Sequence, residues 1–390
     1  MSTAEPVATG SGGLADRIRA EVSAELPAAV ALRHALHADP RLSGQESDTT
    51  AVVVAALGHG DGVVTAGTGR YVGGTDAPVV LRAELDALPV TEATGAPWTA
   101  TGPAMHACGH DVHLAAVVAV TRAIARCDPP RPVAALFQPR EEGAPSGARD
   151  VVASGLLRET GAVAVIAAHV QPQVEAGVVA VTPGFVNASA DHFDLVIHGH
   201  GGHAGYPHTV RDPVVALAAV VLALQQLVSR RIDPVHGAVC TIGTVSAGTA
   251  SNIVPDTARA GGTLRAMDPA DRVRLVELLR EVATATATAW GCTAELEVHE
   301  GEPAVVNDVG LATRAAAHLA AAGVRVETEF RSFGADDFSY YSAGPDAPPS
   351  LMAFVGVEGG AGLHDPRFLP PDATVALVAE ALVAGYLAAL

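Results

Sequence analysis

Lysine is absent from this sequence of 390 residues, so its 24 cationic side chains are all arginines. They are outnumbered by 42 acidic residues, which leaves a formal net charge of −18 at pH 7. An acidic surface repels phosphate groups and therefore argues against nucleic acid or an anionic membrane as a partner. The charge does not restrict the substrate, because a small basic pocket can lie within an acidic protein.

Cysteine is scarce as well. The chain has four cysteines, and they are widely spaced: Cys108, Cys127, Cys240 and Cys292. They form no CxxC pair, and their spacing matches no small disulfide framework. We expect three of them to be ordinary buried or indifferent thiols, whereas Cys108 has neighbours that set it apart.

No apolar run is long enough to cross a membrane. The longest, residues 213–228, includes Gln225 and Gln226 and falls short of the ~20 residues that a membrane helix requires. Residues 1–13 are small and polar, and no charged stretch leads there into an apolar core, as it would in a signal peptide. We therefore expect a loose N-terminal tail on a soluble, cytoplasmic protein.

Hydrophobic residues, in contrast, are abundant, at 49% of the chain, while charged residues make up 17%. This composition is ample for packed cores and unlike that of a disordered chain. A length of 390 residues is long for one core. The sequence therefore predicts two domains.

Helical and strand patterns alternate through the first half of the chain. We expect helices at 46–57 and 112–126, and strands at 79–85, 133–137 and 163–168. Nearly continuous apolar strands are typical of a sheet whose two faces are covered by helices. Open α/β sheets bind their ligands in the loops beyond the carboxyl ends of the strands. We therefore look for a site in the loops that follow these strands.

A different pattern begins near Phe185. The elements expected there are a strand at 191–199, a helix from Asp212-Pro213 to about Ser229, strands at 237–246 and 258–267, a helix at 269–289 and a strand at 292–299. This β-α-β-β-α-β order is that of a ferredoxin-like fold.

The first pattern resumes afterwards, with a helix expected at 308–322, a strand at 351–355 and a closing helix from Asp372. We therefore predict a discontinuous, mixed α/β/α domain that carries an inserted α+β ferredoxin-like domain. The predicted boundaries are 1–184 and 301–390 for the α/β/α domain and 185–300 for the inserted domain.

Soft and borderline metal ligands lie on separate segments near the ends of the expected strands. Cys108 and His110 flank a glycine that can make a tight turn, Glu141-Glu142 follows the second strand, His169 ends the third, and His364 comes after the insertion. Thiolate, imidazole and carboxylate together are ligands of zinc and similar ions, not of calcium or magnesium. An adjacent pair of glutamates leaves one carboxylate for metal and one for proton transfer, which indicates metal-assisted hydrolysis.

Each of these segments also has an ordinary structural interpretation. Cys108 and His110 could be a buried thiol beside a capping imidazole, and the glutamate pair could be a solvated acidic loop. A lone histidine such as His169 or His364 is more often a hydrogen-bonded core residue than a ligand. Their shared placement near strand ends favours a metal site. We assign no functional role to the remaining histidines of these strands and motifs, His106, His113 and His192.

The predicted inserted domain has a histidine-rich run at 198–208. Such a run could bind metal on its own, or it could be a loop that offers His203 to a substrate. Asn252 and Arg265 could supply an oxyanion donor and a clamp for a substrate carboxylate. The alternatives are an ordinary turn amide and an edge-strand cation.

In this order, the motifs resemble those of the M20 metallopeptidase/amidohydrolase family, and particularly its aminoacylase-like branch of hippurate, N-acyl-amino-acid and auxin-conjugate hydrolases. The resemblance extends essentially from end to end, from Leu36-His37 to Phe368. The segments that carry it include 81–89, 106–111, 137–142, 202–204, 251–255 and 337–341.

The resemblance implies two divalent ions (Zn, Mn, Co or Ni) whose ligands are Cys108, as the bridge, with His110, Glu142, His169 and His364. It also implies that Glu141 is the general base, that Asp86 is a supporting acid that orients a ligand, and that His203 and Asn252 meet the substrate. His203 would act across the interface of a homodimer formed by the inserted domain, which would also serve as a lid.

The expected activity is hydrolysis of the amide bond of N-acyl amino acids or related small conjugates. A dipeptidase, a carboxypeptidase, a biosynthetic deacetylase and a non-catalytic binder remain alternatives. Some positions differ from the usual pattern of the branch, where Asp is usual at Glu84, Ala at Arg140, Lys at His200 and Ser-Glu at Ala335-Asp336. None of these differences removes a predicted ligand, so they bear on substrate preference more than on chemistry.

Overall fold

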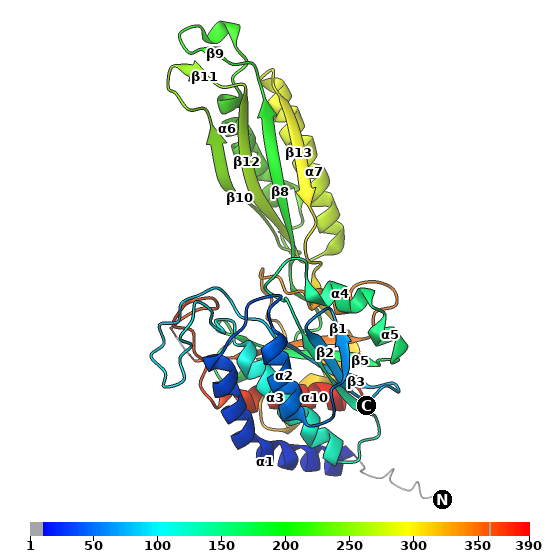
Figure 1. The fold of residues 1–390 in the computed structure, drawn as a ribbon. Helices are drawn as coiled ribbons and strands as arrows, with labels where there is room; N and C mark the ends of the chain where they lie inside the picture. Colours follow the sequence, from blue (N-terminus) through cyan, green and yellow to red (C-terminus); the bar gives the residue numbers. More distant parts are fainter. Residues whose placement is uncertain (1–10, 359) are drawn as a thin grey trace, which may run out of the picture. The chain divides into compact units, whose positions relative to one another are not determined.

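The computed structural model describes residues 11–358 and 360–390, and the chain divides into two compact units (Figure 1). The first unit comprises the chain up to Gly184 together with Val306–Phe330 and Tyr340–Leu390, and the second comprises Phe185–Val305 and Arg331–Ser339. Among the described residues, no helix is both long and apolar enough to cross a membrane.

The second unit is larger than the predicted insertion of 185–300. Residues 301–305 and 331–339 also belong to it. Ser332 explains the second of these additions, because its backbone N–H donates to Val186 and its carbonyl accepts from Ala188. Contacts between segments so distant in sequence are not visible in the local sequence pattern. The prediction therefore placed residues 331–339 in the α/β/α domain.

The first unit is built on a mixed sheet of eight strands in the order β1-β2-β4-β3-β5-β16-β6-β15. The strands are β1 (Val63–Thr65), β2 (Gly69–Gly73), β3 (Val79–Glu84), β4 (Val133–Gln138), β5 (Ala164–Gln171), β6 (Val178–Ala180), β15 (Arg325–Glu327) and β16 (Ser350–Gly356). Strands β4, β3, β5 and β16 run parallel to one another, whereas β2 is antiparallel to β4 and β6 to β16. The parallel strands are buried along their whole length, as their apolar sequences predict.

Helices α3 and α10 pack against the central strands, and α1 packs against both helices. The helices of this unit include α1 (Ser11–Ala38), α2 (Ser47–Leu57), α3 (His110–Arg126), α4 (Gly147–Ala153), α5 (Leu156–Glu159), α8 (Val309–Ala321) and α10 (Thr374–Ala388), and most of the short helix α9 (Ser339–Ser342) also belongs to it. The long helix α1 was not predicted, and residues 11–13 of the expected loose tail belong to it. The rest of that tail, residues 1–10, lies outside the described residues.

One strand boundary in this unit differs from the prediction in a way that matters for the site. Strand β5 continues to Gln171, so His169 lies within the strand instead of ending it. The extension is stabilised by pairing with β16, in which Phe354 faces His169 and Gly356 faces Gln171. Such pairing depends on a distant part of the chain and is not visible in the local pattern.

The second unit has the predicted β-α-β-β-α-β order. Its elements are β8 (Ser189–His198), α6 (Pro213–Leu224), β10 (Ala238–Ala247), β12 (Thr257–Ala266), α7 (Pro269–Ala289) and β13 (Thr293–His299), and the strands form an antiparallel sheet in the order β10-β12-β8-β13. Helices α6 and α7 each begin after an aspartate cap followed by proline, and their apolar residues share one core with the sheet. Helix α6 ends at Leu224, before the expected Ser229, and a π-helical turn at Leu227–Arg231 follows it.

Candidate metal centre

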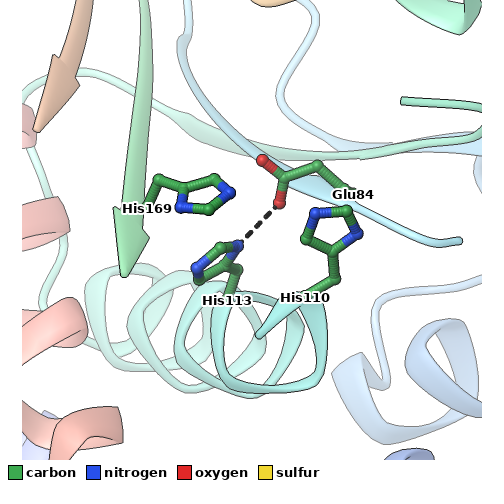
Figure 2. Close-up of side chains that lie close together, drawn as sticks. All are labelled: Glu84, His110, His113 and His169. Carbon is green, nitrogen blue, oxygen red and sulfur yellow. Dashed lines mark hydrogen bonds and ion pairs between the residues drawn. The ribbon is translucent and has the colours of Figure 1, made fainter. Parts of the chain in front are cut away.

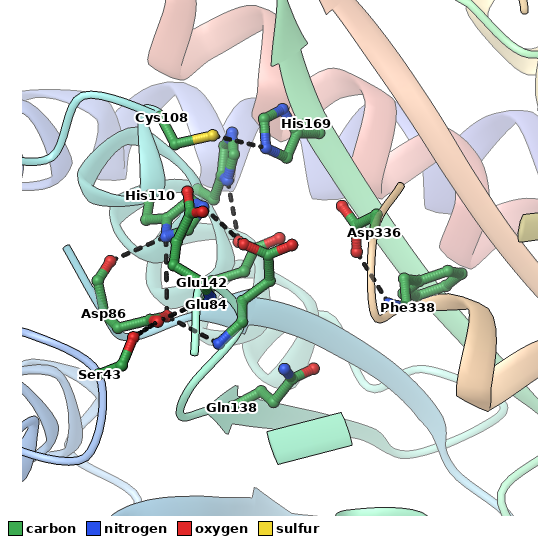
Figure 3. A network of polar contacts seen from close by, with 12 residues as sticks. Ser43, Glu84, Asp86, Cys108, His110, Gln138, Glu142, His169, Asp336 and Phe338 are labelled. Carbon is green, nitrogen blue, oxygen red and sulfur yellow. Dashed lines mark hydrogen bonds and ion pairs between the residues drawn. The ribbon is translucent and has the colours of Figure 1, made fainter. Parts of the chain in front are cut away.

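Cys108 and His110 lie on one segment (Figure 3). This segment turns sharply at Gly109, immediately before α3. Gly109 has a φ of 84°, a left-handed conformation that costs other residues about 1–2 kcal/mol. A Cβ atom at this position would also lie 2.5 Å from Cγ2 of Val170. The turn therefore requires glycine, and it directs the thiol of Cys108 and the ring of His110 toward one buried volume.

The ring of His110 is held by the carbonyl oxygen of Asp86, which accepts a hydrogen bond from Nδ1 at 2.8 Å. In a neutral ring this bond places the proton on Nδ1 and leaves the lone pair on Nε2. Nε2 is buried without a hydrogen-bond partner and lies 3.8 Å from Oε2 of Glu141. Burial lowers the pKa of His110, but the carboxylates of Glu84 and Asp86 outweigh this effect and raise the pKa above its ordinary value. The surroundings thus favour a cation at this nitrogen.

His169 is oriented in the same manner from β5. Its Nδ1 donates to the carbonyl oxygen of Val170 at 2.6 Å, and its Nε2 lies 3.5 Å from Sγ of Cys108. Burial lowers the pKa of His169 to about 3, so the ring is neutral near pH 7 and its Nε2 lone pair is available. Backbone carbonyls therefore fix the ligand-competent tautomers of both His110 and His169.

Glu141 and Glu142 are held in place through their backbone N–H groups. The carboxylate of Asp86 accepts the N–H of Glu141 at 3.1 Å and the N–H of Glu142 at 2.9 Å, and Ser43 donates its hydroxyl to the same carboxylate. Asp86 was expected to orient a ligand. It contacts His110 through its carbonyl oxygen and uses its carboxylate to clamp the loop of the two glutamates.

A second buried carboxylate supports the turn before this pair. Arg140 has a left-handed φ of 52°, and its N–H donates to Oε1 of Glu46 at 3.0 Å. Glu46 also accepts from the N–H of Gly44 and from the hydroxyl of Thr68. In the sequence, Glu46 stands out only as the first residue of the helix expected at 46–57.

His364 approaches from the C-terminal part of the chain. It has a left-handed φ of 67°, and its N–H donates to the carbonyl of Ala107 at 2.8 Å, which ties its loop to the turn that carries Cys108. Its Nε2 lies 3.2 Å from Oε1 of Glu142. The hydrogen bond to Glu142 raises the pKa of His364, and burial opposes this change more weakly.

The structure thus brings all of the predicted metal ligands together in the first unit. Donor atoms of Cys108, His110 and Glu142 lie within 4.8 Å of one another. Cys108 connects this group to His169, and Glu142 connects it to His364. Burial and the neighbouring carboxylates raise the pKa of the Cys108 thiol well above its ordinary value, so it must lose a proton to bind metal. The orphaned Nε2 of His110, the mixed donor set and the surplus of carboxylates fit divalent ions, and the thiol of Cys108 lies within reach of both His169 and the pair formed by His110 and Glu142.

A further group of potential ligands was not expected. Side-chain donors of Glu84, His110, His113 and His169 also lie within 4.8 Å of one another (Figure 2). The sequence analysis gives His113 no role, although the i, i+3 spacing of His110 and His113 on α3 indicates that both rings share a face of the helix.

Residues of the second unit fall into two places. His203 lies on β9 (Gly202–His203), which pairs with β11 (Ile253–Val254), and Ala204 donates its N–H to the carbonyl of Asn252. His203 and Asn252 are therefore neighbours. Strand β12 begins at Thr257, and Arg265 lies near its other end. At 3.3 Å per residue, the two residues are about 26 Å apart along the strand. Nη1 of Arg265 donates to the carbonyl of Phe333. The predicted group of substrate-binding residues is thus not a single cluster within this unit.

Replacing Gly109 by alanine should destabilise the protein more than a comparable change elsewhere. Gly58 is the matched control, because its φ of 73° is also left-handed but nothing lies within 4 Å of an added Cβ. Both variants should lose about 1–2 kcal/mol of unfolding free energy from backbone strain. Only Gly109→Ala adds the clash with Val170, so it should lose more, and it should also bind metal more weakly. Denaturant titration of both variants measures the difference, and equal losses would contradict this account of the turn.

Comparison with known proteins gives concordant matches. The sequence pattern of peptidase family M20/M25/M40 matches residues 80–384. The chain is 35% identical over 355 residues to the N-acetylcysteine deacetylase of Bacillus subtilis (strain 168), which covers 86% of this chain and 90% of that protein. It is 31% identical over 362 residues to the N-acetyldiaminopimelate deacetylase of Shouchella clausii (strain KSM-K16), which covers 90% of this chain and 96% of that protein. A solved Bacillus subtilis structure, described as a dinuclear metal binding peptidase from the M20 family, superimposes with a TM-score of 0.81 at 29% identity and covers 94% of this chain and 98% of that one.

Proposed function

Because the chain belongs to peptidase family M20/M25/M40 and is a metal-dependent amide hydrolase, we propose that it cleaves N-acyl amino acids or closely related small amide conjugates. The proposal is supported by the two deacetylases described above, which share about a third of their residues with this chain over most of its length. The observation that carries it is the placement of Glu141 beside the ligand cluster. Its side chain is 10% exposed and 3.8 Å from the free nitrogen of His110.

Cys108, His110, Glu142, His169 and His364 would hold two divalent ions of the Zn, Mn, Co or Ni type. When bound, such ions lower the pKa of water toward neutrality and polarise the amide carbonyl. Glu141 takes the proton of the attacking water and then delivers it to the leaving amine. Asp86 supports this role, because its carboxylate accepts the backbone N–H of Glu141 and so fixes the loop without engaging the side chain of Glu141 in this bond.

The second unit would serve as lid and dimerisation domain. His203 donates to the oxyanion that forms on the substrate, and Asn252 contacts the substrate beside it. The ring of His203 suits this role, because its Nδ1 accepts the N–H of Gly205 at 3.0 Å, which places the proton of the neutral ring on Nε2. The side chain is exposed, so this donor is open to a ligand. Arg265, whose guanidinium holds Phe333, would act on the substrate carboxylate from a separate position.

A substrate panel tests the proposed specificity. Protein reconstituted separately with zinc, manganese and cobalt is assayed on N-acetyl and N-benzoyl amino acids and on dipeptides. We expect turnover of N-acyl amino acids to exceed that of dipeptides. Preferential cleavage of dipeptides would overturn the substrate class while leaving the hydrolase chemistry intact, and metal binding without turnover of any amide would indicate a binding protein.

Cys108→Ala should change the metal stoichiometry. Wild-type protein is expected to bind about two divalent ions per chain, and this variant should lose at least one, because the thiol lies within reach of His169 and also of His110 and Glu142. Cys127→Ala is the control, since its thiol lies at the other end of α3. Elemental analysis of both proteins measures the effect. Unchanged metal content in Cys108→Ala would contradict its proposed bridging role.

A further inference from the structure

A buried network of hydrogen-bonded side chains lies directly beside the rings of His110 and His169. Arg82 and Glu84 are two positions apart on β3 and therefore lie on the same face of the strand. Each is about 1% exposed, as is His113 on α3. Nη1 of Arg82 donates to Oε1 of Glu84, and His113 Nδ1 lies 2.9 Å from Oε2 of Glu84 (Figure 2). Burial opposes ionisation of Glu84, but the Arg82 guanidinium and His113 outweigh it and hold the pKa of the carboxyl well below its ordinary value.

This network of side chains reaches the backbone of β5. The hydrogen-bonded ladder between β3 and β5 runs from Val79 opposite Ala164 to Leu81 opposite Ile166. Farther along β5, the N–H of Val170 donates to Nε2 of His113 at 3.0 Å. The carbonyl of the same residue accepts from Nδ1 of His169. One peptide segment thus links His113 to His169.

These bonds fix the position of the protons. Because Nε2 of His113 accepts from a backbone N–H, the proton of a neutral ring lies on Nδ1 and is donated to Glu84. Both nitrogens of His113 are therefore engaged, and neither has a lone pair free for metal. The short distance between His113 and the ligand group does not make it a ligand.

We infer that Arg82, Glu84 and His113 are positioning residues, which hold the β5 backbone at Val170 and through it aim Nε2 of His169 at the site beside Cys108. This inference rests on the proposed function, since it takes His169 as a metal ligand. It adds residues that act on the metal without touching it.

The two oxygens of Glu84 give the inference a sharp chemical test. Both accept a hydrogen bond, one from Arg82 and one from His113. Glutamine offers a single acceptor oxygen and turns its amide donor toward another donor, whereas aspartate retains both acceptors. Glu84→Gln should therefore disrupt the network of hydrogen-bonded side chains, and Glu84→Asp should largely preserve it. His113→Leu leaves the buried N–H of Val170 without an acceptor, and His113→Gln keeps an acceptor and a donor.

The test uses full-length protein loaded with zinc and measures the loss of zinc to a competing chelator. Glu84→Gln and His113→Leu are expected to bind zinc roughly 10- to 100-fold more weakly, the usual effect of losing a partner that orients a ligand. Glu84→Asp should remain within about threefold of wild type, and His113→Gln should bind more tightly than His113→Leu. His106→Leu is the matched control, because this fully buried ring has no hydrogen-bond partner at either nitrogen. Its zinc affinity should stay within about threefold as well.

Cobalt-loaded protein provides a second measurement. The visible spectrum should shift in Glu84→Gln and His113→Leu, because the geometry of the His169 ligand changes, while the number of bound ions stays the same at saturating metal. If His113→Leu loses a whole equivalent of metal at saturation, then His113 is a ligand and the inference is wrong. It is also overturned if Glu84→Gln keeps wild-type affinity or if His113→Gln and His113→Leu behave alike.

His169→Ala separates this inference from the proposed ligand set. If His169→Ala retains wild-type zinc affinity, the ligand assignment itself fails. If His169→Ala weakens binding and Glu84→Gln does not, the ligand assignment stands and only the positioning role is overturned.

Discussion

Glu141→Gln is expected to lower kcat by about 10²-fold or more while both metal ions remain bound. The two side chains have nearly the same shape, but the amide cannot accept the proton of water. The backbone clamp on Asp86 does not involve the side chain of Glu141, so the loop should keep its position. Steady-state kinetics at saturating metal, with elemental analysis of the same sample, measures both effects.

Two matched variants give this prediction its control. Glu142→Gln changes the neighbouring residue in the same way and should weaken metal binding, because Glu142 lies within the ligand group. Glu159→Gln changes an exposed glutamate on α5 and should leave kcat unchanged. Near-normal turnover of Glu141→Gln would show that another group takes the proton.

The sequence was sufficient to predict that the proposed ligands come together, because most of them lie close to segments with a plain local signal. The apolar runs of β3, β4 and β5 indicated parallel strands whose ends share one edge of the sheet, and the loops after them carry Asp86 and Glu141-Glu142. The comparisons confirm the family resemblance, and it is this resemblance that implies the bridging role proposed for Cys108 and the roles proposed for the carboxylates.

The supporting residues could not be found in this way, because their roles depend on contacts between distant segments. Nothing near His113 in sequence indicates that its ring accepts the N–H of Val170, 57 positions away. The left-handed turn at Arg140 depends on Glu46, 94 positions before it. Helix α1 was not predicted, because its apolar residues follow no strong helical period. It is stabilised instead by packing on α3 and α10.

His203→Ala is expected to lower kcat by roughly 10²-fold, the scale of losing one oxyanion donor, and to leave metal content unchanged. Every proposed ligand lies in the first unit, so a change on β9 should not alter the metal. His208→Ala is the control, because it removes another exposed histidine from the same segment. If the histidine-rich run were a separate metal store, His203→Ala would instead lower metal content and spare catalysis.

Mixing two inactive variants tests whether His203 acts on the neighbouring chain of a dimer. In a mixed dimer of His203→Ala and Glu141→Gln, one site combines intact Glu141 from one chain with intact His203 from the other, and the second site has neither. Random exchange at equal concentrations makes half of the dimers mixed, so about a quarter of wild-type activity should return. If His203 serves its own chain, no site is restored at any mixing ratio. Recovery of activity should therefore follow the fraction of mixed dimers measured by native mass spectrometry, and its absence after complete exchange would place His203 in its own chain's site or outside catalysis.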